Sequence, residues 1–104
     1  MIKTGLSPEI IETLNCIFSK YPTLEQVKLY GSRAKGTYKV QSDIDLVAFG
    51  LQLDRYVIGD ILAELEESEI PYRIDLQNYL ELTNLALMDH INRVGLVIFD
   101  RRAL

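Results

Sequence analysis

Residues 29–49 read LYGSRAKGTYKVQSDIDLVAF, and this stretch decides the fold. Its last part, Ser42 to Phe49, alternates in polarity and predicts a β-strand. Side chains two residues apart on a strand share a face, so Asp43 and Asp45 point the same way with Cα atoms roughly 7 Å apart. Two carboxylates about 5 Å apart repel by about 3 kcal/mol at an effective dielectric constant of 20. A divalent cation between them would turn that cost into a gain, and oxygen ligands suit Mg²⁺.

The dipeptide Gly31-Ser32 begins a turn at the end of the preceding apolar run. A strand that stops at such a turn before a helical segment exposes backbone N–H groups and a hydroxyl, which suit phosphate oxygens. Arg33 and Ser42 are further candidates for nucleotide contact: Arg33 adds positive charge beside Ser32, although a surface ion pair is the alternative. For Ser42, support of the loop or of the strand entry is the favoured role, and phosphate contact is the minority alternative. A phosphate cradle beside paired carboxylates suggests metal-assisted phosphoryl chemistry on a nucleotide.

The composition bounds the class of protein. The 104 residues predict one domain over residues 1–104, and 48% hydrophobic with 25% charged residues is ordinary for a globular protein. The net charge of −4 argues against direct nucleic-acid binding, which favours a basic face. No apolar run approaches the ~20 residues of a membrane span, and we expect neither a signal peptide nor a membrane partner. One cysteine, Cys16, forbids an internal disulfide and fits a cytoplasmic protein.

The rest of the chain alternates predicted helices and strands. Helices are expected over residues 8–20, 81–94 and about 15 residues that Asp54 caps and Pro71 stops, with a helical turn over 32–36. Strands are expected over residues 25–30, 42–49, 72–77 and 96–99, followed by a polar tail over 100–104. Gly95 is the expected C-cap of the last helix. This alternation indicates an α/β or α+β layer fold.

Asp75 is the third acidic residue of interest. It lies in the middle of a predicted strand among apolar residues, where an ionised carboxylate needs a partner. If that strand lies beside the second, Asp75 joins Asp43 and Asp45 on one face, and three carboxylates can hold two Mg²⁺ ions about 4 Å apart. Asp75 would then act as base on the attacking hydroxyl. A salt bridge from Asp75 to Arg73 or Arg33 is the equally weighted alternative.

Two other residues are assigned structural roles. Cys16 is expected to be a buried thiol in the first helix. His90, the only histidine, is expected to be a surface or hydrogen-bonded residue and not a catalytic base. One cysteine and one histidine provide no zinc site.

The spacing of these residues is specific when taken together. Gly31-Ser32, ten intervening residues, Asp43-x-Asp45 and a later strand with Asp75 resemble the nucleotidyltransferase superfamily that includes DNA polymerase beta. The fuller pattern, Gly31-Ser32-Arg33-Ala34-Lys35-Gly36 with Ser42-Asp43-Ile44-Asp45-Leu46, resembles its minimal nucleotidyltransferase branch. That resemblance covers nearly the whole chain and implies an α+β fold, a small mixed β-sheet flanked by helices.

The resemblance also implies a function. Gly31 and Ser32 would contact nucleotide phosphates, Asp43 and Asp45 would bind Mg²⁺, and Asp75 would be the third acid. The enzyme would transfer AMP from ATP to a hydroxyl. Members of this branch often pair with a helical HEPN-type protein, as antitoxin in a type VII-like toxin–antitoxin pair, and can add AMP to a tyrosine of that toxin.

Two alternatives remain open on the sequence. The chain could be an antitoxin that inhibits its partner by binding and occlusion without catalysis, but binding alone does not need three clustered acids. It could also be a nucleotidyltransferase for a small molecule or RNA, which the acidic balance and the lack of a second domain disfavour.

Overall fold

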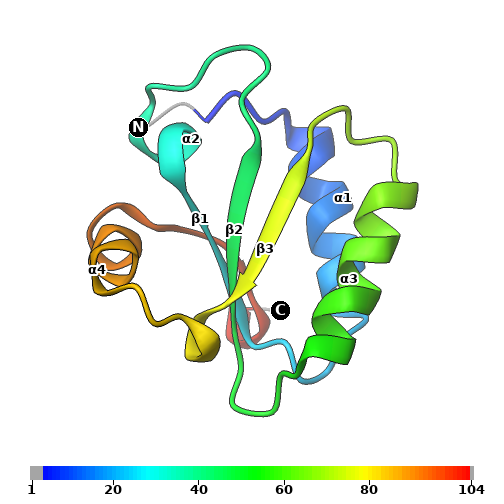
Figure 1. Cartoon of the computed structure of the whole chain (residues 1–104). Coiled ribbons are helices and arrows are strands. Elements are labelled where there is room, and N and C mark those ends of the chain that lie inside the picture. The colour runs from blue at the N-terminus through cyan, green and yellow to red at the C-terminus, as the bar shows by residue number, and fades with distance from the viewer. Residues whose placement is uncertain (1–3, 104) are drawn as a thin grey trace.

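A computed structural model describes residues 4–103 as a four-stranded mixed sheet flanked by helices (Figure 1). The strands are β1 Gln26–Tyr30, β2 Ile44–Phe49, β3 Ile74–Asn78 and β4 Leu96–Asp100. The α-helices are α1 Pro8–Ser19, α2 Gly31–Lys35, α3 Arg55–Glu67 and α4 Leu85–Val94, and two 3₁₀ turns are η1 Tyr79–Glu81 and η2 Arg101–Ala103. This architecture confirms the predicted α+β fold.

The strands lie in the order β3-β2-β1-β4. β1 pairs antiparallel with β2 and with β4, whereas β2 and β3 run parallel. Figure 1 shows α1 and α3 together on one face of the sheet and α2 and α4 on the other. The parallel pair therefore forms one end of the sheet, with β3 as its edge strand.

The alternation of β2 divides the interior between the two faces. Ile44 and Leu46 pack into the larger core with α1 and α3, while Val47 packs with Tyr30 of β1 and Ile91 of α4. Asp45 shares the Val47 face because strand side chains alternate. Asp45, the acidic residue of β2, therefore faces the α2 and α4 side of the sheet.

Several predicted boundaries are confirmed. Asp54 caps α3 by accepting from the N–H groups of Tyr56 and Val57 at 3.0 and 2.9 Å. Ser7 caps α1 by accepting from Ile10 N–H at 3.2 Å. Short polar caps satisfy N–H groups that the first helical turn leaves unpaired, so both helices begin where their sequence signals stand.

Three other expectations are wrong. The helix expected over residues 81–94 begins only at Leu85, because the side chain of Asn84 accepts from Leu87 N–H at 3.1 Å and starts α4 there. Asp43 precedes β2 instead of lying in it. The polar tail expected over 100–104 is not a separate segment: Asp100 ends β4, and Arg101 donates to the carbonyl oxygens of Leu24 and Tyr21 at 2.8 and 2.7 Å. Leu104 lies outside the described residues.

Cys16 is exposed, which corrects its expected burial. α1 turns Leu14, Ile17 and Phe18 towards the core. At 100° per residue, Cys16 lies about 200° around the helix from both Leu14 and Phe18. It therefore falls on the opposite face of a helix whose overall composition is apolar.

Within residues 4–103, no helix is long and apolar enough to cross a membrane.

Candidate active site

Gly31 forms the turn at which β1 passes directly into α2. Its φ of 74° lies in the left-handed region, which glycine adopts without a steric penalty. A Cβ built at Gly31 would collide with Oδ2 of Asp45. Glycine is therefore required here for two reasons, and the second shows that the turn and the Asp45 carboxylate are in direct contact.

The N–H of Gly31 is already occupied. It donates to Nε2 of His90 on α4 at 3.1 Å. The His90 ring also packs edge-on against the Tyr30 ring, with the two ring centroids 6.1 Å apart. Tyr30, which precedes α2, offers no side-chain hydrogen bond to the first turn of that helix. The donors that α2 can offer to an anion are therefore those of Ser32 and the residues after it. His90 is a hydrogen-bonded residue, as expected, but the sequence did not predict that its partner would be the Gly31 turn.

Asp45 and Asp75 are neighbours across the parallel strands. The register aligns Asp45 of β2 with Asp75 of β3, and aligns Asp45 with Tyr30 of β1 on its other side. Burial raises the pKa of Asp45, and the charges of Asp75 and Asp43 raise it further. A cation would relieve this like-charge repulsion.

Asp75 is held by neutral groups. Tyr30 donates its hydroxyl hydrogen to Oδ2 of Asp75 at 3.5 Å, and Nε2 of Gln77 donates to the two carboxylate oxygens at 3.3 and 3.1 Å. The ion pairs of residues 4–103 include none to Asp75, so the predicted alternative of a salt bridge to Arg73 or Arg33 is wrong. Burial, followed by the charges of Asp75 and Asp45, raises the pKa of Tyr30 to about 12.

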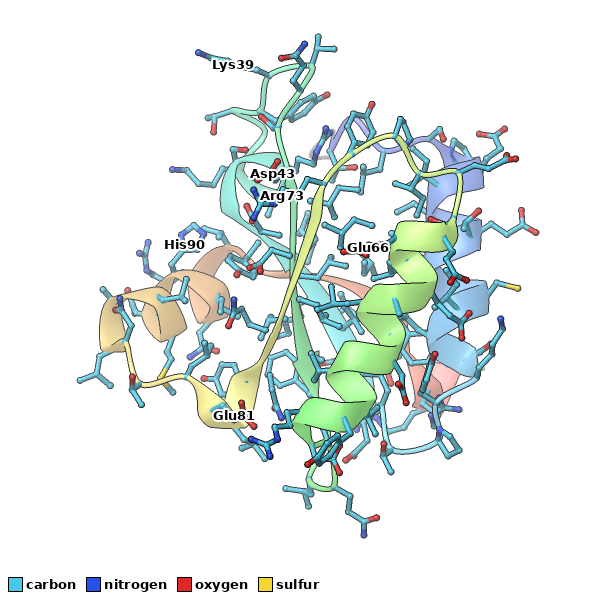
Figure 2. All side chains as sticks on the ribbon, turned by 45° about the vertical axis from the view of Figure 1, so that its right-hand side comes forward. Lys39, Asp43, Glu66, Arg73, Glu81 and His90 are labelled. Atoms are coloured by element: carbon cyan, nitrogen blue, oxygen red, sulfur yellow. The ribbon has the colours of Figure 1, made fainter. Side chains whose placement is uncertain are left out.

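Asp43 lies at the exposed margin of this acidic group. It immediately precedes β2, towards the end of the molecule where α2 begins (Figure 2). Its charge acts on Asp45, yet the described residues include no three acidic, histidine or cysteine side chains already clustered as a metal site. The donors present are hard carboxylate oxygens that repel one another, and such donors fit Mg²⁺. Asp45 and Asp75 are the assembled pair, and Asp43 would complete the set by turning its exposed side chain.

Arg33 and Ser42 both form hydrogen bonds with the backbone close to the Gly31 turn. The Arg33 side chain is only 1% exposed, and it donates to the backbone carbonyl oxygens of Ser42 and Thr4. The hydroxyl of Ser42 accepts from Lys39 N–H at 2.8 Å within the loop. The Arg33 side chain is thus fully engaged with the chain itself, so its effect on a nucleotide would pass through the backbone that it holds. Ser42 is half-buried, and its hydroxyl supports the loop by accepting from Lys39 N–H.

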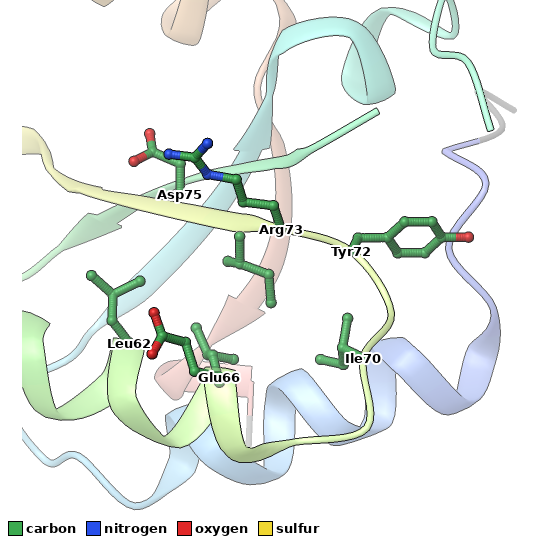
Figure 3. A pocket seen from close by; sticks show the side chains of 8 residues that line it. Leu62, Glu66, Ile70, Tyr72, Arg73 and Asp75 are labelled. Atoms are coloured by element: carbon green, nitrogen blue, oxygen red, sulfur yellow. The ribbon is translucent and has the colours of Figure 1, made fainter. Parts of the chain in front are cut away.

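A pocket of about 360 Å³ adjoins the acidic pair at the free edge of the sheet (Figure 3). It lies between α3 and β3 and is lined by Leu62, Leu65, Glu66, Ile70, Tyr72, Arg73, Ile74 and Asp75. Figure 3 shows the Arg73 and Asp75 side chains on one side of β3, with Leu62 and Glu66 of α3 on the other. Asp75 therefore belongs both to the carboxylate pair and to the wall of an open pocket whose lining mixes apolar and charged side chains.

The sequence did not predict that Tyr30 contacts Asp75 or that His90 contacts Gly31. The contact between Tyr30 and Asp75 joins residues that are 45 positions apart in the sequence. The contact between His90 and Gly31 spans 59 positions. The available signal was that Tyr30 directly precedes Gly31 and that His90 lies on a predicted amphipathic helix. Neither pattern specifies which distant residue is contacted.

Comparison with known proteins assigns the chain to a family. The family model described as "Polymerase beta, Nucleotidyltransferase" matches residues 12–103. A search of curated protein sequences gave no significant match.

Solved structures share the fold at low sequence identity. A toxin–antitoxin crystal structure with AMP-PNP has a TM-score of 0.72 at 19% identity, over 89% of this chain and 75% of that chain. The toxin–antitoxin MntA-HepT gives 0.59 at 19%, over 91% and 70%. A tri-AMPylated Shewanella oneidensis HEPN toxin in complex with MNT antitoxin gives 0.58 at 20%, over 91% and 70%.

Proposed function

Because this chain belongs to the polymerase beta nucleotidyltransferase family, we propose that it transfers AMP from ATP to a hydroxyl group of a HEPN-type helical protein and releases pyrophosphate. The observation that carries the proposal is the direct pairing of Asp45 with Asp75 beside the Gly31 turn. The turn that we propose for phosphate binding is in contact with the Asp45 carboxylate, which Asp75 repels. A protein that only bound a partner would gain nothing from that repulsion.

Different residues act on the nucleotide and on the acceptor hydroxyl. Ser32, at the uncapped start of α2, offers its hydroxyl and backbone N–H to a phosphate oxygen, while Gly31 allows the close approach. Asp43, Asp45 and Asp75 would hold Mg²⁺, which supplies charge neutralisation at the phosphates and activation of the hydroxyl when bound. Asp75 lies on the edge strand β3, and we assign to its carboxylate the role of accepting the proton of the acceptor hydroxyl.

A hydroxyl of a HEPN-type partner, in particular that of a tyrosine, is the proposed acceptor. The fold is shared with antitoxins solved with toxins, one of which is a tri-AMPylated HEPN toxin. By the same comparison, occlusion of the partner by binding alone is the second candidate. The net charge of −4 gives little support to an RNA acceptor.

The deciding experiment incubates the protein with labelled ATP, Mg²⁺ and a HEPN-type partner, and reads the intact mass of both chains. We expect AMP units on the partner, lost with EDTA and with Asp45→Asn or Asp75→Asn. Asp60→Asn, which removes an exposed carboxylate on α3, is the matched control and should transfer normally. A stable complex without any transfer would favour the occlusion function instead.

A further inference from the structure

Arg33 makes contacts that join all three segments of the candidate site. We propose that Arg33 is a positioning residue, which fixes the Gly31-Ser32 turn relative to the Asp43 loop and to the start of β3, instead of a residue that touches the nucleotide. This inference deepens the proposed function and rests on it for the reaction concerned. Its geometric basis is the hydrogen bonds, the aromatic contacts and the burial of the Arg33 side chain.

The hydrogen bonds of Arg33 connect the turn to the acidic loop. Nε and Nη2 both donate to the carbonyl oxygen of Ser42, at 3.2 and 2.8 Å, and Nη1 donates to that of Thr4 at 2.8 Å. Arg33 directly follows Ser32, and Ser42 directly precedes Asp43. A two-pronged guanidinium contact thus sets the separation between the proposed phosphate-binding residue and the first acid.

Two aromatic rings hold the same guanidinium. The carbon atom of the guanidinium lies 4.3 Å from the ring centroid of Tyr72 and 5.1 Å from that of Tyr38. Tyr72 leads into β3, which carries Asp75, and Tyr38 belongs to the loop that ends at Ser42. Stacking on both rings therefore links the third acid to the other two parts of the site.

The packing around Arg33 leaves no room for a nucleotide. The side chain is 1% exposed. A Cβ built on Gly5 would come within 2.8 Å of Nη1 of Arg33, so the N-terminal segment covers the guanidinium closely. Because its donors point at backbone carbonyls and its faces meet tyrosine rings, Arg33 can act on a phosphate only through the position of Ser32. Misplacement of reacting groups by about 1 Å can cost on the order of 100-fold in rate.

Arg101 provides a matched control at another place in the fold. It also donates to backbone carbonyls, from Nε to Leu24 at 2.8 Å and from Nη2 to Tyr21 at 2.7 Å, and its guanidinium lies 5.4 Å from the Phe99 ring. It joins the end of β4 to the segment after α1 and makes no hydrogen bond to the segments that carry Asp43, Asp45 and Asp75. Lysine keeps the charge but loses the planar fork in both cases. Arg33→Lys and Arg101→Lys should therefore lose comparable stability and differ only in what happens at the site.

The experiment measures AMP-PNP affinity in the presence of Mg²⁺ for Arg33→Lys, Arg33→Gln and Arg101→Lys, each shown to be folded by circular dichroism. We expect both Arg33 variants to weaken binding about tenfold or more, since a misplaced turn loses several contacts at once. Arg101→Lys should stay within about twofold of the wild type, because sites that share no partners act independently. Retained affinity in Arg33→Lys with loss in Arg33→Gln would indicate a direct charge contact and overturn the proposal. Equal loss in Arg33→Lys and Arg101→Lys would overturn it as well.

A second readout does not depend on nucleotide binding. Amide hydrogen exchange of residues 31–33 and 37–43 should speed up in Arg33→Lys and stay unchanged in Arg101→Lys. If the wild-type protein binds no nucleotide, the proposed function fails, and this measurement alone then decides the positioning role. Unchanged exchange in Arg33→Lys would refute it.

A milder substitution covers the case in which the Arg33 variants do not fold. Tyr38→Leu removes one of the two stacked rings and should increase exchange over residues 37–43. Tyr56→Leu is its control, because the Tyr56 ring lies 5.1 Å from the Arg55 guanidinium at an exposed position. Equal exchange in the two tyrosine variants would contradict the proposal.

Discussion

Asp45 and Asp75 are direct register partners across the parallel strands β2 and β3. Both side chains lie on the sheet face that α2 and α4 flank, and the Gly31 turn packs against the carboxylate of Asp45. The acidic pair is thus a product of strand register, and its repulsion is part of the folded state. The following predictions test this arrangement and the contacts that support it.

Asp45→Asn should stabilise the protein without ligand at neutral pH. The raised pKa of Asp45, caused by burial and then by Asp75 and Asp43, means that the ionised carboxylate is less favourable in the folded than in the unfolded chain. As the pH falls through the raised pKa, the folded state takes up the proton first, so this penalty disappears. The gain in melting temperature should therefore be present at pH 7 and vanish below about 3.9, the ordinary pKa of aspartate.

Thermal melts of Asp45→Asn and of Asp60→Asn across this pH range check the expectation. The control removes one exposed negative charge from α3 and should shift the melting temperature little at any pH. A lower melting temperature for Asp45→Asn at pH 7 would mean that the carboxylate is stabilised by a partner in the folded state.

Gly31→Ala should destabilise the fold by about 1–2 kcal/mol, the cost of a left-handed backbone at a residue with a Cβ. The clash with Asp45 Oδ2 adds to that cost and should displace the carboxylate. Gly59→Ala is the matched control: Gly59 lies within α3, nothing lies within 4 Å of its built Cβ, and alanine favours a helix by about 0.5–1 kcal/mol. Urea unfolding of the two variants should give opposite signs. A neutral effect at Gly31 would argue against the turn geometry.

His90→Phe should destabilise the protein by about 1–3 kcal/mol, because the N–H of Gly31 loses its acceptor. Phenylalanine keeps an aromatic ring beside Tyr30, so the loss reports the hydrogen bond and not the packing. His90→Gln keeps a side-chain acceptor and should recover part of the stability. Chemical denaturation measures both changes, and equal stability of the two variants would show that the Gly31 hydrogen bond contributes little.

The titration of Tyr30 should lower the free energy of unfolding as the solution becomes strongly alkaline. Its pKa is raised from 10.0 to about 12, first by burial and then by Asp75 and Asp45, so the folded state retains a proton that the unfolded chain loses. Stability is therefore unaffected by this group below pH 10 and falls between pH 10 and 12. Denaturation at several pH values should show a shallower decline in Tyr30→Phe. Tyrosinate absorbance should also lose a late-titrating component in that variant, and an unchanged titration would contradict the raised pKa.

The sequence by itself determined the local elements and the identity of the acidic residues. Alternation in residues 44–49 follows from strand geometry, and the caps at Ser7 and Asp54 act on N–H groups two or three residues away. The spacing from Gly31-Ser32 to Asp43-x-Asp45, followed by Asp75, was sufficient to indicate the nucleotidyltransferase family, which the family model over residues 12–103 confirms. Such signals are readable because each depends on residues close together along the chain. The site roles of these residues stay predictions until they are tested.

Only the tertiary structure decided which distant residues meet. The parallel register that joins Asp45 to Asp75 and the packing of α4 that brings His90 to Gly31 depend on contacts between segments far apart in sequence. Arg33 illustrates the difference most clearly: beside Ser32 it reads as a phosphate contact, yet burial directs its guanidinium to the carbonyls of Ser42 and Thr4. A buried cation must satisfy its donors, and only the assembled fold determines which acceptors lie within reach.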